Sequence, residues 1–167
     1  MQYRKIAAVH RVEPSNAPGQ VPLRFAFGIR RGRQMTFESE IQRLIATYLA
    51  AWNARDFEGM AALFTEPATY VVPGGTLHIP DREALIQKLK AQFKALEDDG
   101  FDHTEIETVQ ARQCNETTAF VDLLNLRRLR SDGTSVGEID SVYVCIRQDG
   151  QWRLSIAMAC WPGWKEN

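Results

Sequence analysis

The sequence predicts an α+β protein in which three N-terminal helices pack in a curved, mainly antiparallel sheet that forms a half-barrel. Two observations carry this prediction. Between residues 36 and 98, apolar residues recur at spacings of three and four, which is typical of amphipathic helices. From residue 100 onward the period changes to two, and short turns separate four long segments of this kind. This order indicates helices followed by an antiparallel meander whose curved sheet can wrap around them.

The first helix is expected to begin after Thr36, because a threonine side chain is a good N-cap. Its apolar face consists of residues three or four positions apart: Ile41, Leu44, Ile45, Tyr48, Leu49 and Trp52. Residues 53–56 break this pattern, so we expect the helix to end there.

Two further helices and one strand follow. Asp56 is the expected cap of a short second helix, and residues 68–72 are expected to form a strand that ends at the turn 73–75. The second helix carries Met60, Ala61, Leu63 and Phe64. Asp81 is the expected cap of the third helix, which residues 98–100 end. Its apolar stripe consists of Leu85, Ile86, Leu89, Phe93 and Leu96.

The meander is expected to have four strands. They cover residues 104–112, 118–129, 135–147 and 152–160. The connections at 115–116, 131–133 and 148–150 are rich in Asn, Asp and Gly, as hairpin turns are.

Length and composition exclude several classes of protein. The 167 residues, 44% hydrophobic and 25% charged with a net charge of −1, suit one globular domain. No run approaches the roughly 18 apolar residues of a membrane span, and the first residues lack the apolar stretch of a secretory signal. Cys114, Cys145 and Cys160 lack CxxC spacing. We therefore expect reduced thiols in a cytoplasmic protein that does not contact a membrane.

Motifs for cofactor chemistry are missing. The sequence contains no GxSxG, GxxxxGK[ST] or GxGxxG pattern, so hydride transfer, phosphoryl transfer and serine hydrolysis have no support. Three scattered histidines without His-x-His or HExxH spacing predict no metal site. We expect neither a cofactor nor a metal.

The charge pattern divides the chain into a basic extension, residues 1–34, and a domain, residues 35–167. Residues 1–34 hold seven Arg and Lys against one acid, Glu13. Three interpretations of the extension stay open. It is a strand-forming arm, or it folds back on the acidic domain. Alternatively, translation naturally starts at Met35, and residues 1–34 are a segment upstream of that start. A nucleic-acid partner is not expected, because the extension lacks aromatic interleaving and a compact basic stripe.

One stretch resembles a known superfamily. Residues 47–73, TYLAAWNARDFEGMAALFTEPATYVVP, contain an N-A-x-D turn, an A-L-F helix end and a strand that begins A-T, and D-G-x-W-R follows at 149–153. This pattern resembles the nuclear-transport-factor-2-like superfamily, which includes SnoaL-like polyketide cyclases, ketosteroid isomerases and scytalone dehydratases. The resemblance covers about residues 36–161. It implies a cone-shaped barrel whose open end holds an apolar pocket, often in a homodimer.

The ketosteroid isomerases of that superfamily suggest site residues. Their mechanism uses a carboxylate base, with a tyrosine and a protonated aspartic acid that hold the oxyanion. By resemblance, the tyrosine corresponds to Tyr48 and the oxyanion aspartate to Asp140, after Ile139. The base position holds Val72, which cannot accept a proton. Isomerisation by this mechanism is therefore not expected.

Other carboxylates offer alternatives. Period two places Glu138 on the same strand face as Asp140, so both are candidates for the pocket, although Glu138 is also suited to a solvated strand end. Asp122 lies among apolar neighbours, which predicts either a role in the pocket or a structural pair with Arg128 or Arg130. The candidate catalytic residues are thus Asp140, Tyr48 and Asp122.

Aromatic and histidine side chains complete the candidate ligand-binding set. Tyr48, Trp52, Tyr70 and Phe93 are expected either in the core or against a ligand. A buried Tyr48 needs a partner for its hydroxyl, and Asp140 is the expected one. His78 and His103 could reach the mouth of a pocket or lie in solvent.

Three functions remain open from the sequence. The first is a protein that binds a small apolar or aromatic molecule in the barrel pocket. The alternative is a cofactor-free isomerase, dehydratase or polyketide-cyclase-type enzyme. A third is a protein-interaction domain whose barrel is filled by side chains. In each case we expect a homodimer, by resemblance to the superfamily.

Overall fold

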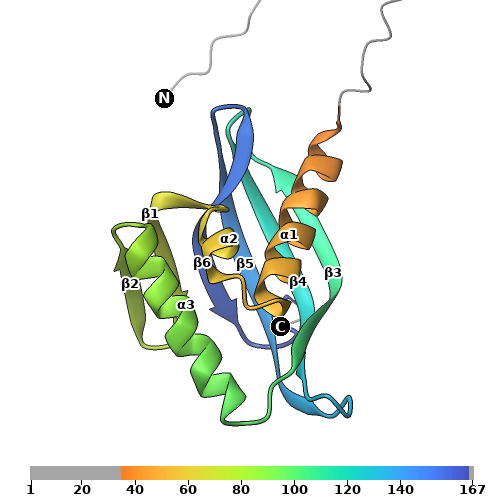
Figure 1. Ribbon diagram of the computed structural model, residues 1–167. Helices are drawn as coiled ribbons and strands as arrows, with labels where there is room; N and C mark the ends of the chain where they lie inside the picture. The colour runs from red at the N-terminus through yellow and green to blue at the C-terminus, as the bar shows by residue number, and fades with distance from the viewer. Residues whose placement is uncertain (1–34, 166–167) are drawn as a thin grey trace, which may run out of the picture. The chain divides into compact units, whose positions relative to one another are not determined.

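The computed structural model describes residues 35–165 (Figure 1). The predicted extension, residues 1–34, lies outside the described residues. The elements follow in the order α1 (Phe37–Asn53), α2 (Phe57–Ala61), β1 (Phe64–Val72), β2 (Gly75–Ile79), α3 (Arg82–Glu97), β3 (His103–Gln113), β4 (Thr118–Leu129), β5 (Ser135–Gln148) and β6 (Gln151–Cys160). The α+β class is confirmed.

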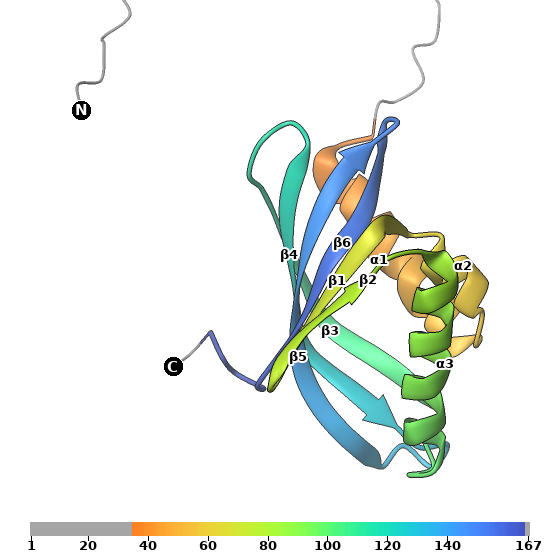
Figure 2. The same ribbon diagram turned by 90° about the vertical axis from the view of Figure 1, so that its left-hand side faces the viewer.

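The six strands form one sheet in the order β2-β1-β6-β5-β4-β3. The pair β1–β6 is parallel and every other pair is antiparallel, so the meander β3 to β6 has the predicted connectivity. The sheet is curved and does not close, and the helices lie over one of its faces (Figures 1 and 2). Residues 161–165, here called the tail, leave the sheet on the side away from the helices (Figure 2).

Two strands, and not the single expected one, come before the third helix. Although α1 and α2 come before β1, α3 is inserted between β2 and β3. The prediction also placed Phe64 in the second helix, but it begins β1 and pairs with Leu154 of β6. Strand β2 was not predicted, because four of its five residues are exposed and it has no apolar alternation.

Each helix begins at the N-cap that the sequence indicated. The side chains of Thr36, Asp56 and Asp81 accept hydrogen bonds from the backbone N–H groups of Ser39, Gly59 and Ala84. These bonds satisfy N–H groups that have no partner within the helix. Among the described residues, no helix has both the length and the apolar character that crossing a membrane requires.

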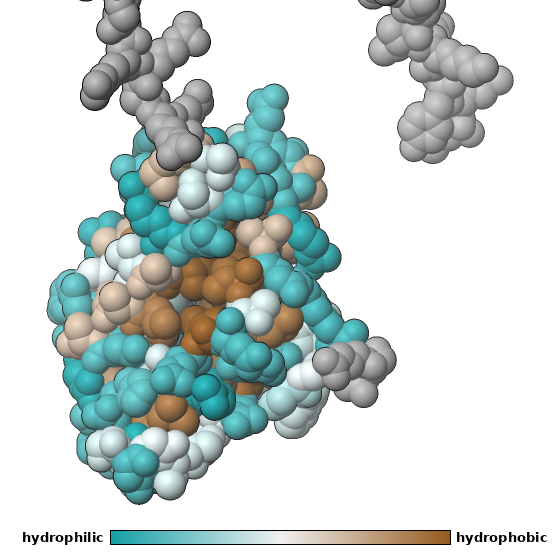
Figure 3. All heavy atoms as spheres, turned by 90° about the vertical axis from the view of Figure 1, so that its right-hand side faces the viewer, coloured by the Kyte–Doolittle hydropathy of each residue, from teal (hydrophilic) through white to brown (hydrophobic). Residues whose placement is uncertain are grey.

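The core lies between the helices and the concave face of the sheet. Ile41 of α1, Leu89 of α3 and Leu154 of β6 are each at most 1% exposed. An aromatic cluster joins α1 to α3 and the loop after it: the ring centroids of Trp52 and Phe93 are 5.2 Å apart, and those of Phe93 and Phe101 5.4 Å. Viewed from the side of α1 and β3, apolar side chains reach the surface mainly in a central area, and hydrophilic side chains surround most of it (Figure 3).

A β-bulge between β4 and β5 decides which side chains face the helices. Leu123 pairs with Ser141 and Leu126 with Ile139, so Leu124 and Asn125 together stand opposite Asp140. Asn125 has a φ of 54°, a conformation that asparagine adopts more readily than most residues. Since side chains alternate along a strand, the extra residue exchanges the two faces of β4 beyond it.

Candidate ligand-binding pocket

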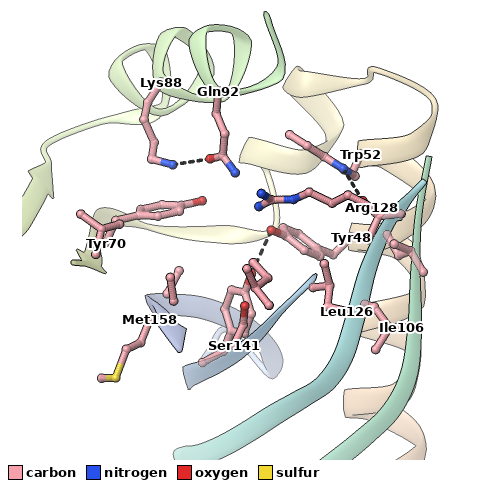
Figure 4. A pocket seen from close by; sticks show the side chains of 17 residues that line it. Tyr48, Trp52, Tyr70, Lys88, Gln92, Ile106, Leu126, Arg128, Ser141 and Met158 are labelled. Atoms are coloured by element: carbon pink, nitrogen blue, oxygen red, sulfur yellow. Dashed lines mark hydrogen bonds between the residues drawn. The ribbon is translucent and has the colours of Figure 1, made fainter. Parts of the chain in front are cut away.

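A cavity of about 210 Å³ lies between the helices and the sheet (Figure 4). Its walls come from α1, α3 and all the strands except β2. The lining residues are Tyr48, Leu49, Trp52, Tyr70, Val72, Lys88, Gln92, Thr104, Ile106, Leu126, Arg128, Ile139, Ser141, Tyr143, Ala157, Met158 and Ala159. Most are apolar or aromatic, and a small number of polar groups are directed among them, as in many small-molecule sites.

Two phenols meet at one wall. The hydroxyl oxygens of Tyr48 on α1 and Tyr143 on β5 are 2.9 Å apart and share a hydrogen bond. Burial raises the pKa of both groups, so both hydroxyls keep their protons at neutral pH. With one hydroxyl donating to the other, the pair has a proton left that can be donated to a third acceptor.

The hydroxyl of Tyr70 on β1 has no hydrogen-bond partner among the described residues, although it is buried. Burial also raises the pKa of this phenol well above its ordinary value. The hydroxyl points into the cavity, toward the end of Arg128 (Figure 4). A buried polar group without a hydrogen-bond partner lowers the stability of the fold, so such groups are rare in native proteins.

Two half-buried cations face the same space. Lys88 on α3 lies over the ring of Tyr70, its Nζ 3.6 Å from the ring centroid, and donates to Oε1 of Gln92 at 2.6 Å. Desolvation first, and then the charge of Arg128, lowers the pKa of Lys88 to about 8. Arg128 on β4 has no carboxylate partner among the described residues, and burial lowers its pKa.

Three of the predicted ligand-binding residues line the cavity: Tyr48, Trp52 and Tyr70. Trp52 is fixed by its indole N–H, which donates to the hydroxyl of Thr104 at 3.0 Å. Phe93 does not reach the cavity; it packs in the core beneath Trp52 and against Phe57.

Asp140 does not pair with Tyr48, so this expectation was wrong. Its Oδ1 accepts the N–H of Asn125 in the bulge at 2.8 Å, and its Oδ2 accepts the N–H of Gly163 in the tail at 3.0 Å. The alternation of side chains correctly divided the residues of β5 between two faces. The face expected at the cavity, with Glu138 and Asp140, points away from it, and the face with Ile139, Ser141 and Tyr143 lines it. Asp140, only 2% exposed, therefore binds the backbone on the face away from the cavity.

Asp122 and Glu138 also lie outside the cavity lining. Asp122 is fully buried and forms ion pairs with Arg112 on β3 and Lys165 in the tail. The expected partners Arg128 and Arg130 are not used. The bulge turns Arg128 to the opposite face. Glu138 is exposed near the start of β5.

The two histidines do not contribute to the cavity either. His78 is exposed on the edge strand β2. His103 is half-buried at the start of β3, and its Nδ1 lies 2.8 Å from Oδ2 of Asp102. No group of three or more metal-ligating side chains gathers within residues 35–165.

The sequence analysis did not predict that Lys88 and Arg128 line the cavity, although the sequence contains an indication of each position. Lys88 and Gln92 are four residues apart on α3 and flank the stripe of Leu85 and Leu89, so both lie where the helix meets the pocket. For Arg128 the signal is the run of Leu123, Leu124 and Leu126, whose spacing departs from strict alternation and indicates a bulge.

Fold and pocket together define a class: a small α+β domain whose curved, open sheet and covering helices enclose a cavity of small-molecule size. Residues 39–161 match the family described as NTF2-like protein (DUF6841), and the chain belongs to this family. The superfamily resemblance read from the sequence is thereby confirmed. No match is found among curated proteins.

Solved structures share the fold at low sequence identity. An NTF2-like protein with a cystatin-like fold from Novosphingobium aromaticivorans has a TM-score of 0.62 and 22% identity, over 76% of this chain and 82% of that one. A protein of unknown function with a cystatin-like fold from Nostoc punctiforme has a TM-score of 0.62 and 17% identity, over 78% and 96%. Rv3472, of unknown function, from Mycobacterium tuberculosis has a TM-score of 0.59 and 23% identity, over 72% and 68%.

Proposed function

We propose that this protein binds a small molecule in the cavity between α1, α3 and the sheet. The observation that carries the proposal is the hydroxyl of Tyr70, which is buried at the cavity and has no partner among the described residues. A native fold satisfies nearly all buried polar groups, so this hydroxyl is well explained by a bond to a bound molecule. The hydrogen-bonded pair of Tyr48 and Tyr143 offers a second polar anchor on another wall.

The size of the cavity limits the ligand. An apolar cavity of about 150 Å³ is large enough for benzene, and this one measures about 210 Å³. A single aromatic ring with one or two substituents suits this volume.

Ligand binding can be tested by filling the cavity. Val72 lines it at the end of β1, whereas its neighbour Val71 does not. We expect Val72→Phe to abolish the thermal stabilisation that single-ring compounds give the wild-type protein, and Val71→Phe to keep it. Native mass spectrometry of freshly purified protein would report a retained ligand directly. If no single-ring compound stabilises the wild type, or if Val72→Phe responds as the wild type does, the proposal fails.

A cofactor-free isomerase, dehydratase or cyclase is the second candidate function. Val72, at the isomerase base position, lines the cavity as an apolar residue, and the described part of the chain contributes no carboxylate to the lining. Lys88 favours this candidate, because an amine with a pKa of about 8 is a usable proton acceptor near neutral pH. An enzyme of this kind would lose turnover in Lys88→Met while it still bound its substrate. A protein-interaction domain with a filled barrel is disfavoured by the open cavity.

We further propose that the protein forms a homodimer through the face of the sheet away from the helices. Phe120 on that face is 38% exposed, and Trp161 in the tail is 76% exposed. Exposed apolar side chains that gather in one patch mark an association surface. We expect Phe120→Glu to halve the mass in light scattering, and Leu77→Glu, on the exposed edge strand β2, to leave it unchanged. A cytoplasmic location, for which the three free thiols are suited, stays part of the proposal.

A further inference from the structure

The pocket has an unbalanced charge. Among residues 35–165, its lining contains two cations, Lys88 and Arg128, and no carboxylate. Neither cation takes part in an ion pair among the described residues. The buried carboxylates outside the pocket, in contrast, have partners. Asp122 has two cationic partners, and Asp140 accepts hydrogen bonds from two backbone N–H groups.

This arrangement is costly while the pocket holds no negative charge. Half-burying a cation removes part of its hydration, and two cations that sense one another repel. Both effects are visible in Lys88, whose pKa is lowered by desolvation and by the charge of Arg128. An anion between the two side chains would offset both costs, whereas a neutral ligand would offset neither.

The donors are also placed for a planar anion. The guanidinium of Arg128 points toward the hydroxyl of Tyr70, and the amine of Lys88 lies above the ring of the same tyrosine (Figure 4). A guanidinium can donate two parallel N–H bonds to a carboxylate. The free hydroxyl of Tyr70 can supply a further donor to the same group.

The remaining walls indicate the body of the ligand. Trp52, Ile106, Leu126 and Ile139 form an apolar surface that a compact, fully hydrated anion such as phosphate would not cover. An organic anion can place its charged group against the cations and its apolar part against these side chains.

We propose that the ligand is a small organic carboxylate, whose carboxylate is bound by Arg128, Lys88 and Tyr70 and whose apolar body lies against Trp52 and Ile106. This inference rests on the proposed binding function and specifies the chemical class of the ligand.

The test compares charged and neutral probes of one shape. Calorimetric titration at pH 7 would measure the binding of benzoate and of benzamide, its neutral planar isostere, with inorganic phosphate as a competitor. For the wild type we expect benzoate to bind at least 10-fold more tightly than benzamide, and phosphate not to displace it. Arg128→Gln should remove this preference. The control Arg127→Gln should keep it, because Arg127 is exposed and pairs with Glu105 instead.

The outcomes separate the two proposals. Equal affinity for benzoate and benzamide would overturn the carboxylate inference and leave the binding function standing. Displacement of benzoate by phosphate at similar concentration would overturn the organic class of the ligand. Failure of both ring compounds to bind would overturn the binding function as well. If Arg128→Gln does not fold, Lys88→Met on α3 replaces it, and an unreduced preference for benzoate in that variant counts against the inference.

Discussion

Replacing Asp140 tests whether this residue stabilises the bulge and the tail. In Asp140→Ala, the N–H of Asn125 loses a bond of 2.8 Å and the N–H of Gly163 loses one of 3.0 Å. A hydrogen bond to a charged group contributes about 1.5–3 kcal/mol. The amide in the sheet has no easy replacement, whereas the amide in the tail can regain water, so we expect a loss of about 2–4 kcal/mol. Asp140→Asn keeps one acceptor oxygen and should lose about half as much.

The assay is urea denaturation followed by far-ultraviolet circular dichroism, at one protein concentration for all variants. Glu138→Ala is the matched control, because Glu138 is exposed on the same strand and its loss should change stability by no more than about 0.5 kcal/mol. The reasoning is refuted if Asp140→Ala is as stable as the wild type, or if Asp140→Ala and the control Glu138→Ala are destabilised by the same amount.

Three further predictions concern stability. Asn125→Val should cost about 1–3 kcal/mol in urea denaturation, because a β-branched residue is strained at a φ of 54°, whereas Asn125→Gly should be nearly neutral. Between pH 8 and 10.5 the unfolded chain binds more protons at Lys88 than the folded chain does. The free energy of unfolding of the wild type should therefore rise with pH relative to that of Lys88→Met. A difference in free energy between the two proteins that stays constant over this pH range would contradict the lowered pKa. Arg112→Ala and Lys165→Ala together should destabilise by more than the sum of the single variants in a double-mutant cycle, because Asp122 then keeps no cation; strict additivity would argue against the pairing.

The fold was largely predictable because its signals are local. The caps at Thr36, Asp56 and Asp81 satisfy N–H groups within one turn, so residue type and spacing are enough to place the start of each helix. The first residues of β1 pair with the distant strand β6, and nothing in their own sequence reveals this pairing. Strand β2 pairs with its neighbour β1, but its five residues carry no apolar period that would identify a strand.

The pocket was harder to predict because strand faces are a tertiary property. Alternation on β5 separates Asp140 and Val142 from Ser141 and Tyr143, but both groups contain polar and apolar members. Nothing local indicates which group faces the helices. On β4 the bulge at Asn125 exchanges the faces once more, so Arg128 lies at the cavity although regular alternation would group it with Asp122.

The cavity differs in charge from the isomerase site that the sequence resembles. That reaction needs a carboxylate to remove a proton from a neutral ketone, and a neutral acid to donate a hydrogen bond to the oxyanion that develops. Here the base position holds the apolar Val72, and the corresponding aspartate binds the backbone on the other face. Tyr48 and Val72 both line the cavity, but of these two only Tyr48 carries a polar group. In the proposed complex, the two cations would stabilise a negative charge that the ligand carries before any reaction. The fold is therefore shared, whereas the charges at the cavity favour a ligand that arrives as an anion over one that becomes an anion by losing a proton there.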